Sequence, residues 1–189
     1  MGKARVAHVV GFDDAPFEPA HRGNVLVIGT VYAGTRLEGV VSCQVRRDGA
    51  NATRALAQCV RNSRFYPQLH AVLLQGIALA GFNVVDIELL RRQLRRPVLV
   101  VIRRRPDLRR IERALLAHVP GGAHKWRLIL KAGPVERIGG LYVQRAGLTG
   151  EQAEELLRNL SCNGKLPEPL RAAHLIAGAL TRGQSSGRA

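Results

Sequence analysis

Acidic and amide side chains stand at the ends of several apolar runs that predict strands. Asp13 and Asp14 follow the first such run, Asp48 follows the third, and Gln75 follows a short run with no polar residue. If these strands are neighbours, their ends meet at one edge of a sheet, and carboxylates gathered there need a compensating cation. Mg²⁺ prefers oxygen ligands and keeps waters that can attack a phosphodiester. Asp13, Asp14 and Asp48 are therefore candidate ligands of Mg²⁺ or Mn²⁺, and Asp13, Asp48 and Gln75 are candidate catalytic residues.

The same residues have an ordinary structural interpretation. Asp is frequent in turns and at helix N-caps. Asp13 shortly precedes Pro16, and Asp48 opens the turn-like stretch 48–51. In that interpretation Asp48 or Asn51 caps the helix that follows. The residue types alone do not decide whether these aspartates are turn residues or metal ligands.

Arginine supplies nearly all of the large positive charge. The 189 residues include 29 Lys and Arg against 14 Asp and Glu, for a net charge of +15. This excess favours a polyanionic partner, because each neutralised phosphate releases counterions. Arg also pairs with phosphate through two hydrogen bonds at once. Aromatic residues make up only 4% of the chain, which disfavours binding by base stacking. The composition therefore predicts nucleic acid as the partner.

Runs of arginine cluster between residues 91 and 110. They are Arg91-Arg92, Arg95-Arg96, Arg103-Arg104-Arg105 and Arg109-Arg110. We interpret these runs as a track for a phosphate backbone, which receives a large share of the hydrogen bonds that proteins make to DNA. The alternative is a solvated surface, although so many like charges repel one another there.

The apolar pattern predicts a sheet with helices between its later strands. Strands are expected at 5–12, 25–32, 37–45, 71–74, 98–102, 126–130 and 141–144, with a hairpin turn at 33–36. Helices are expected to about residue 63, over 82–96, from 106 through 119, from the capping box at Thr149 to about Leu160, and from near Pro167. The run 71–74 suits a strand buried on both faces, and the unit from 71 to 102 suits a parallel crossover.

Hairpin-linked strands thus come first, and parallel strands alternating with helices follow. This order is the layout of the ribonuclease-H-like architecture, an α/β class. We expect one domain over residues 1–182 and a loose tail at 183–189. The apolar fraction of 46% is ample for a core.

Cysteine usage and hydropathy bear on location. Cys43, Cys59 and Cys162 are unevenly spaced and include no C-x-x-C pair, which favours a reducing compartment and disfavours a disulfide framework or a zinc site. No secretory apolar segment with a cleavage site is seen, so we expect a cytoplasmic protein. The apolar part of the stretch 71–86 is well short of the roughly 20 residues that a membrane-spanning helix needs, and no membrane partner is expected.

Three stretches make the sequence recognisable. Residues 11–17 read GFDDAPF, residues 73–86 read LLQGIALAGFNVVD, and residues 167–174 read PEPLRAAH. They resemble the archaeal family called endonuclease dU, and the resemblance covers essentially the whole chain. More distantly, the sequence is similar to endonuclease V, a ribonuclease-H-like nuclease that uses Mg²⁺ to cut strands containing deaminated bases. The resemblance implies this fold and this class of reaction.

The resemblance to endonuclease V also implies roles for individual residues. Asp13 matches that family's first-strand aspartate, and Asp48, which follows Arg47, falls where the family has a catalytic glutamate. Gln75 stands where the family has its second catalytic aspartate, and His174 stands where its C-terminal segment carries an aspartate. A glutamine offers one neutral oxygen, so this departure should weaken both cation binding and water activation.

The residues expected to contact nucleic acid come from two sources. The segment 167–171 resembles the proline–arginine segment of endonuclease V, and the arginine track supplies the rest. These residues are Arg47, Arg103, Arg104, Arg105, Arg171 and His174.

The sequence therefore predicts a Mg²⁺-dependent endonuclease that hydrolyses phosphodiester bonds in nucleic acid, DNA above all, containing uracil or hypoxanthine. The competing interpretation is a non-catalytic nucleic-acid-binding protein of the same fold, which the neutral side chain of Gln75 favours. A small-molecule phosphoryl-transfer enzyme is disfavoured because no Gly-rich phosphate loop is present.

Overall fold

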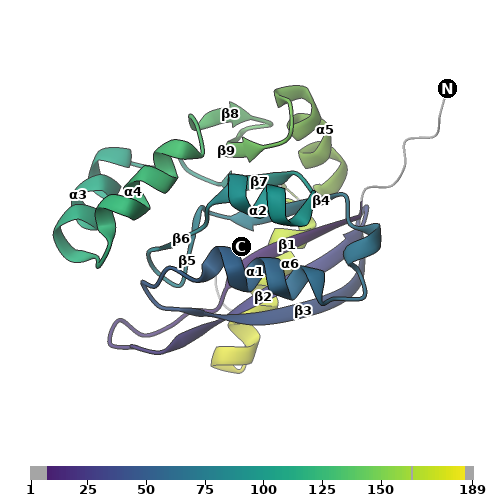
Figure 1. Ribbon diagram of the computed structural model, residues 1–189. Helices are drawn as coiled ribbons and strands as arrows, with labels where there is room; N and C mark the ends of the chain where they lie inside the picture. Colours follow the sequence, from purple (N-terminus) through teal and green to yellow (C-terminus); the bar gives the residue numbers. More distant parts are fainter. Residues whose placement is uncertain (1–7, 163, 186–189) are drawn as a thin grey trace.

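A mixed β-sheet forms the centre of the computed structural model, which describes residues 8–162 and 164–185. Its strands are β1 (His8–Asp14), β2 (Asn24–Ala33), β3 (Arg36–Arg46), β4 (Ala71–Gln75), β7 (Val98–Ile102), β8 (Glu136–Ile138) and β9 (Leu141–Ala146). They lie in the order β3-β2-β1-β4-β7-β9-β8 (Figure 1). β4 is parallel to β1 and to β7, so the carboxyl ends of these three strands meet at one edge. The other neighbours in the sheet pair antiparallel.

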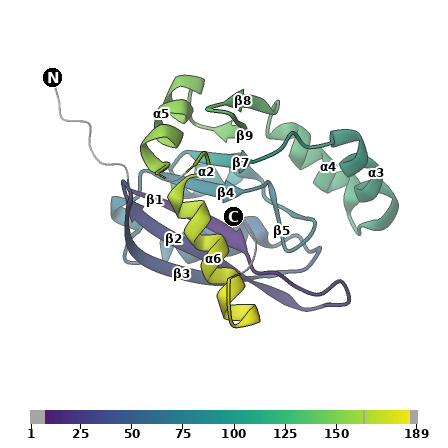
Figure 2. The same cartoon turned by 180° about the vertical axis from the view of Figure 1, so that it is seen from behind.

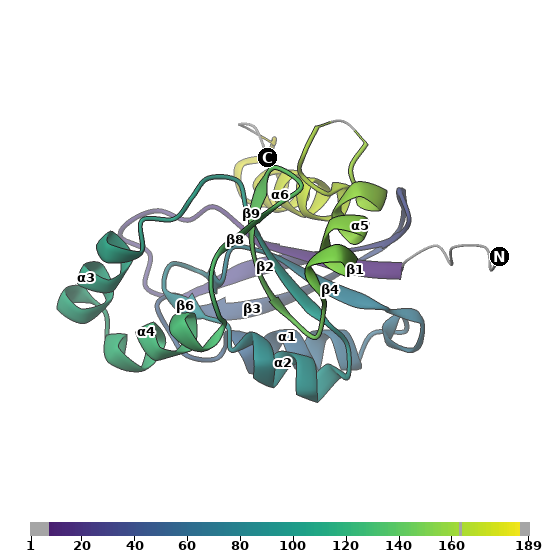
Figure 3. The same cartoon turned by 90° about the horizontal axis from the view of Figure 1, so that it is seen from above.

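Helices cover both faces of this sheet. α1 (Ala52–Arg61) and α2 (Ile87–Leu94) lie on one face, and α5 (Gly150–Leu160) and α6 (Glu168–Arg182) lie on the other (Figure 3). α3 (Leu108–His118) and α4 (Gly122–Lys131) stand outside these layers, beside the small ladder of β5 (Ala78–Leu79) and β6 (Asn83–Val84) (Figures 1 and 2). A 3₁₀ turn, η1 (Tyr66–Gln68), precedes β4.

β4 is enclosed by both helical layers and confirms the prediction of a strand buried on both faces. Val72 and Leu74 pack on the side of α1 and α2, and Ala71 and Leu73 pack on the side of α5 and α6. Leu73 and Leu74 are fully buried. Burial of each such side chain contributes about 1.5–3 kcal/mol. The strand is therefore a rigid base for Gln75, its last residue.

Other local predictions are also confirmed. The hairpin at 33–36 joins β2 to β3, and β7 occupies 98–102 as expected. Thr149 and Gln152 form the predicted capping box, in which the Gln152 amide donates to Thr149 Oγ1 at 3.2 Å and the Thr149 amide donates to Gln152 Oε1 at 2.9 Å. Residues 5–7 of the first predicted strand and 186–189 of the predicted tail lie outside the described residues.

The predicted strand at 126–130 is wrong, because these residues lie in α4. The sequence KWRLILK alternates polar and apolar residues at its start, which favours a strand. Its helical form buries Ile129 against Leu115 of α3 and Val84 of β6, with Trp126 at the border of the same cluster. The free energy gained by burying Ile129 in this cluster outweighs the preference of the local sequence for a strand.

The helix predicted over 82–96 is shorter than expected. It begins after Asp86, whose Oδ1 accepts from the Leu89 amide at 3.0 Å, and it ends before Arg95, which has a left-handed conformation (φ 51°). Asn83 belongs to β6 and does not cap α2. Its Oδ1 accepts from the Ala52 amide at 3.0 Å instead, so this fully buried side chain caps α1 from a distant part of the chain.

Two further findings concern the three cysteines and the apolar length of the helices. Cys43, Cys59 and Cys162 are all free thiols. Among residues 8–162 and 164–185, no helix is long and apolar enough to cross a lipid bilayer.

Candidate active site

A cavity of about 380 Å³ opens where β1 and β4 end. It is lined by residues 13–17, by Gln75, and by His174, Gly178 and Arg182 of α6. The three α6 residues are spaced by four, so they share one face of the helix. Gly178 and Arg182 were not singled out from the sequence, and their positions four and eight residues after His174 are the signal that could have found them. The structure thus brings Asp13, Asp14, Gln75 and His174 together.

Close packing of α6 on the sheet positions this face. Gly11 of β1 is in contact with the backbone at Pro169, and a Cβ atom at residue 11 would lie 2.7 Å from Pro169 Cβ. Thr30 Oγ1 donates to the Pro169 carbonyl at 2.6 Å. Glycine at position 11 therefore allows the first strand and the last helix to touch, which brings His174 to Asp13.

Asp13 and His174 form a partly buried pair. Asp13 is 5% exposed, and its Oδ2 lies 2.8 Å from His174 Nδ1, while its Oδ1 accepts from the Asp14 amide at 3.0 Å. Burial raises the pKa of Asp13 despite these hydrogen bonds. The hydrogen bond that His174 donates to Asp13 raises the pKa of His174, against the effects of burial and of the Arg103 charge. The pair therefore holds a proton more firmly than either group would alone.

Asp14, the last residue of β1, also lines the cavity. Its Oδ2 accepts from the Ala80 amide at 3.0 Å. Burial, followed by the nearby Asp13 charge, raises the pKa of Asp14 to about 6. Two adjacent carboxylates are thus held where water stabilises their charges poorly, and neither forms an ion pair with Lys or Arg among the described residues.

Gln75 contributes an oxygen without a partner. Its Oε1 is buried and accepts no hydrogen bond from the described part of the chain. An unpaired buried polar atom costs about 1–3 kcal/mol, so its retention beside two carboxylates points to a ligand. Two carboxylates and an amide oxygen suit a hard divalent cation, and Mg²⁺ commonly takes one or two carboxylates together with waters and substrate phosphates.

A cation held only by protein side chains is not indicated. Within 8–162 and 164–185, no three Asp, Glu, His or Cys side chains are grouped as a metal site.

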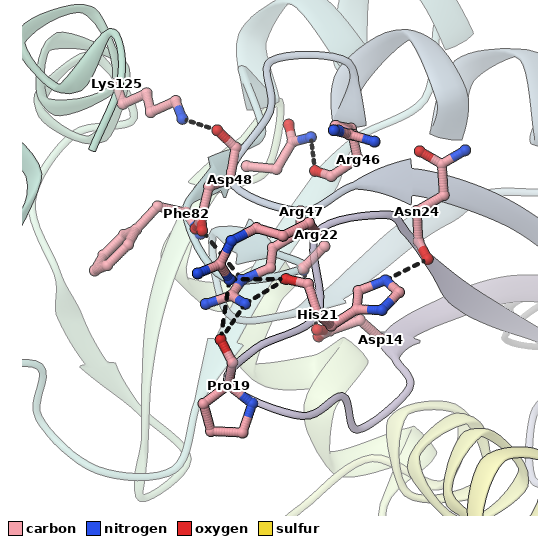
Figure 4. Close-up of polar contacts among 12 residues, drawn as sticks. Asp14, Pro19, His21, Arg22, Asn24, Arg46, Arg47, Asp48, Phe82 and Lys125 are labelled. Carbon is pink, nitrogen blue, oxygen red and sulfur yellow. Dashed lines mark hydrogen bonds and ion pairs between the residues drawn. The ribbon is translucent and has the colours of Figure 1, made fainter. Parts of the chain in front are cut away.

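Asp48 lies outside this cavity and has a different environment (Figure 4). Its Oδ1 accepts from the Phe82 amide at 2.8 Å, and its carbonyl accepts from Lys125 Nζ at 2.5 Å. The backbone has a left-handed conformation (φ 50°), and the carboxylate lies against Gly81, where a Cβ would come within 2.4 Å of Oδ1. Asp48 is therefore placed to brace the turn between β5 and β6.

Arg47 takes part in the same brace. Its Nε lies 3.2 Å from Asp48 Oδ2, and its Nη1 donates to the carbonyls of Pro19 and His21, each at 2.5 Å (Figure 4). The guanidinium also lies over the ring of Phe17, 5.4 Å from the centroid. Since Phe17 lines the cavity, Arg47 links the Asp48 brace to one cavity wall.

The remaining predicted contact residues lie at differing distances from the cavity. Arg103 is close enough for its charge to affect His174, and Arg104 and Arg105 are exposed in the loop that leads from β7 to α3. Arg171 pairs with Glu168 at 2.7 Å and is not a lining residue. A larger hollow of about 540 Å³, between β3 and α1, contains no carboxylate.

The strand order and the two helical layers define an α/β protein with the ribonuclease-H-like fold of endonuclease V. The structure of Ciona intestinalis endonuclease V, in complex with a 24mer DNA containing an inosine followed by a ribo-adenosine, matches with a TM-score of 0.58 at 11% identity. That match covers 90% of this chain and 84% of the Ciona chain.

The family model described as endonuclease dU matches residues 5–181, and the chain belongs to this family. A UPF0215 protein of Deinococcus radiodurans is 57% identical over 184 residues, covering 97% of this chain and 94% of the relative. The crystal structure of a protein of unknown function from Archaeoglobus fulgidus matches with a TM-score of 0.86 at 36% identity, over 92% of this chain and 98% of that one. The Deinococcus relative is bacterial, so the family is not confined to archaea.

Proposed function

We propose that this protein is a divalent-metal-dependent endonuclease that hydrolyses phosphodiester bonds in DNA containing deaminated bases, uracil or hypoxanthine. Membership of the endonuclease dU family and the fold shared with an inosine-DNA-binding endonuclease V support the reaction class. The observation that carries the proposal is the buried, unpartnered Oε1 of Gln75, a residue that lines one cavity with Asp13 and Asp14. A repair role in the cytoplasm follows from this substrate and from the expected compartment.

Each cavity residue has a task in this proposal. Asp13, Asp14 and Gln75 hold Mg²⁺ or Mn²⁺, which when bound supplies charge for the scissile phosphate and lowers the pKa of water. His174 fixes the orientation of Asp13 through the 2.8 Å contact. Arg103 and Arg182 attract the phosphate backbone, and Asp48 and Arg47 hold the surrounding loops in place.

Cleavage of defined oligonucleotides tests the proposal. Duplexes and single strands containing uracil, hypoxanthine or only normal bases are incubated with and without Mg²⁺ or Mn²⁺. We expect metal-dependent cutting of the deaminated substrates. Asp13→Asn should reduce cutting by on the order of 10³-fold, because it removes a metal ligand and a charge. The melting temperature and DNA binding of this variant should be retained, and unchanged cutting would refute the assignment of Asp13.

A non-catalytic nucleic-acid-binding protein is the competing function. The neutral Gln75 and the position of Asp48 outside the cavity favour it, because a single amide replaces negative ligand charge. It predicts salt-sensitive binding without turnover on every substrate. It also predicts that Gln75→Asp increases Mn²⁺ affinity, which titration calorimetry measures directly.

A further inference from the structure

The segment from Arg103 to Lys131 forms a basic arm that contains α3 and α4. Its 29 residues include nine Lys or Arg and two acidic residues, so they hold +7 of the chain's net charge of +15. The two helices stand off the sheet edge at which β4 and β7 end, which is also the edge of the candidate active site (Figures 1 and 2). We call residues 103–131 the basic arm.

Most of the arm's positive charge is not neutralised by the protein. Five exposed arginines form no ion pair with any residue that the structure describes: Arg104, Arg105, Arg109, Arg110 and Arg113. Asp107 is engaged in capping α3, where its Oδ1 accepts from the Arg110 amide at 3.0 Å. Positions 109 and 113 lie on one helix face, about 6 Å apart along the axis. A row of uncompensated positive charges results.

The arm is fixed firmly beside the cavity. Leu115 and Ile129 pack with Val84 in a separate apolar cluster, which joins α3 and α4 to the β5–β6 ladder. Lys125 is 4% exposed and donates to the carbonyl of Asp48. Arg103, the first residue of the arm, is near enough to influence His174. A ligand bound along the arm would therefore be held at a constant position relative to the cavity.

We propose that the basic arm binds the phosphate backbone of double-stranded nucleic acid beside the cleavage site, an inference that rests on the proposed function. Uncompensated arginines complement the regularly spaced charge of a duplex. Single strands are usually bound by stacking on exposed rings, and Trp126, the one Phe, Tyr or Trp residue of the arm, is half-buried against the apolar cluster. The arm thus binds charge and leaves base recognition to the cavity.

Salt-dependent binding of an undamaged duplex tests this proposal without any need for cleavage. The arm variant changes Arg104, Arg105, Arg109 and Arg113 to Gln. The matched control changes Arg54, Arg64, Arg137 and Arg158 to Gln, which removes the same charge from exposed positions outside the arm that also form no ion pair with the described residues. Fluorescence anisotropy in EDTA over a series of salt concentrations gives the slope of log K against log salt.

The slope is negative, and its magnitude should decrease by about 0.9 for each phosphate that the protein ceases to neutralise. The decrease should therefore be roughly 3–4 in the arm variant. The control should change it by less than about 1. Replacement of the four arm arginines by Lys keeps the charge and should restore most of the slope, which shows that a weaker slope in the Gln variant does not come from misfolding. Equal slopes for the arm variant and the control would overturn the proposal.

Two further outcomes are decisive. The arm also exposes Leu116 and Leu130, which are 57% and 56% exposed. If the arm variant loses binding to phosphatidylserine vesicles but keeps duplex binding, the arm is a membrane surface and the proposal fails. If the arm variant loses duplex binding while the wild-type protein cuts no substrate, the arm proposal stands and the proposed endonuclease function fails.

Discussion

The two acidic sites at this end of the sheet differ in how their charges are balanced. The Asp48 carboxylate pairs with Arg47 and accepts a hydrogen bond from the Phe82 backbone amide, and 33% of the side chain is exposed to solvent. Asp13 is buried and pairs with His174, whereas Asp14 is half-buried. Neither has a Lys or Arg ion-pair partner within the described residues, and burial raises the pKa of both. An acid that an arginine of the protein neutralises is best explained by the fold, whereas two adjacent acids that share one histidine, beside an unpaired oxygen, suit a bound cation.

The strongest test of this difference between Asp13 and Asp48 is to neutralise one acid at a time and to measure cleavage. Asp48→Asn keeps an acceptor for the Phe82 amide and tolerates the left-handed backbone, so cutting should stay within about threefold of the wild-type rate. Asp13→Asn should lose on the order of 10³-fold. Single-turnover rates on a uracil duplex measure both. If Asp48→Asn reduces the cleavage rate as much as Asp13→Asn does, Asp48 is a catalytic residue and the comparison is wrong.

The second test concerns stability at Asp48. Asp48→Ala removes a charged acceptor, worth about 1.5–3 kcal/mol, and places Ala in a conformation that costs about 1 kcal/mol or more. Urea denaturation should therefore show a decrease of about 2–4 kcal/mol in the free energy of unfolding. Asp48→Gly, which has no such backbone strain, should be destabilised less. Equal decreases in the two variants would show that the left-handed conformation does not matter.

The third test uses the raised pKa of Asp14. Because this pKa is about 6 in the folded protein and 3.8 ordinarily, the folded state binds the proton more tightly. Stability therefore falls as pH rises from about 4 to about 6, by up to about 3 kcal/mol. Asp14→Asn cannot ionise and should be more stable than the wild type above pH 6, by a margin that disappears below pH 4. Urea unfolding in EDTA checks this, and pH-independent differences would contradict it.

The smallest expected effect sharpens the role of the unpaired oxygen. Gln75→Leu should stabilise the protein by about 1 kcal/mol, because it removes a buried polar atom without a partner. Gln93 provides a matched control, since its Oε1 is also buried and unpaired but does not line the cavity. Gln93→Leu should give a similar gain and leave Mn²⁺ binding unchanged, whereas Gln75→Leu should weaken it. Equal Mn²⁺ affinities in calorimetry would show that Gln75 is not a ligand.

Local signals predicted much of the fold. A short apolar run located β4, a β-branched run located β7, and the Thr149 capping box located α5. The pattern at 126–130 failed because a helix and a strand both satisfy a short mixed run, and only the contacts with Leu115 and Val84 decide between them.

The candidate site was harder to predict in full. Asp13 and Asp14 could be chosen from strand ends, and His174 from the resemblance. The use of Asp48 as a brace depends on Gly81, a residue more than thirty positions away that leaves room for the carboxylate. Nothing near Asp48 in the sequence signals that contact, because its determinants belong to another turn.

The contact between Gly11 and Pro169 determines when the candidate site can assemble during synthesis of the chain. The cavity takes Asp13 from the first strand and His174 from the last helix, so no nascent chain that still lacks α6 has an assembled site. Any hydrolytic activity of this cavity is therefore acquired only after α6 has been synthesised. Cuts or fusions that disturb residues 168–182 should inactivate the protein even when the sheet has already folded.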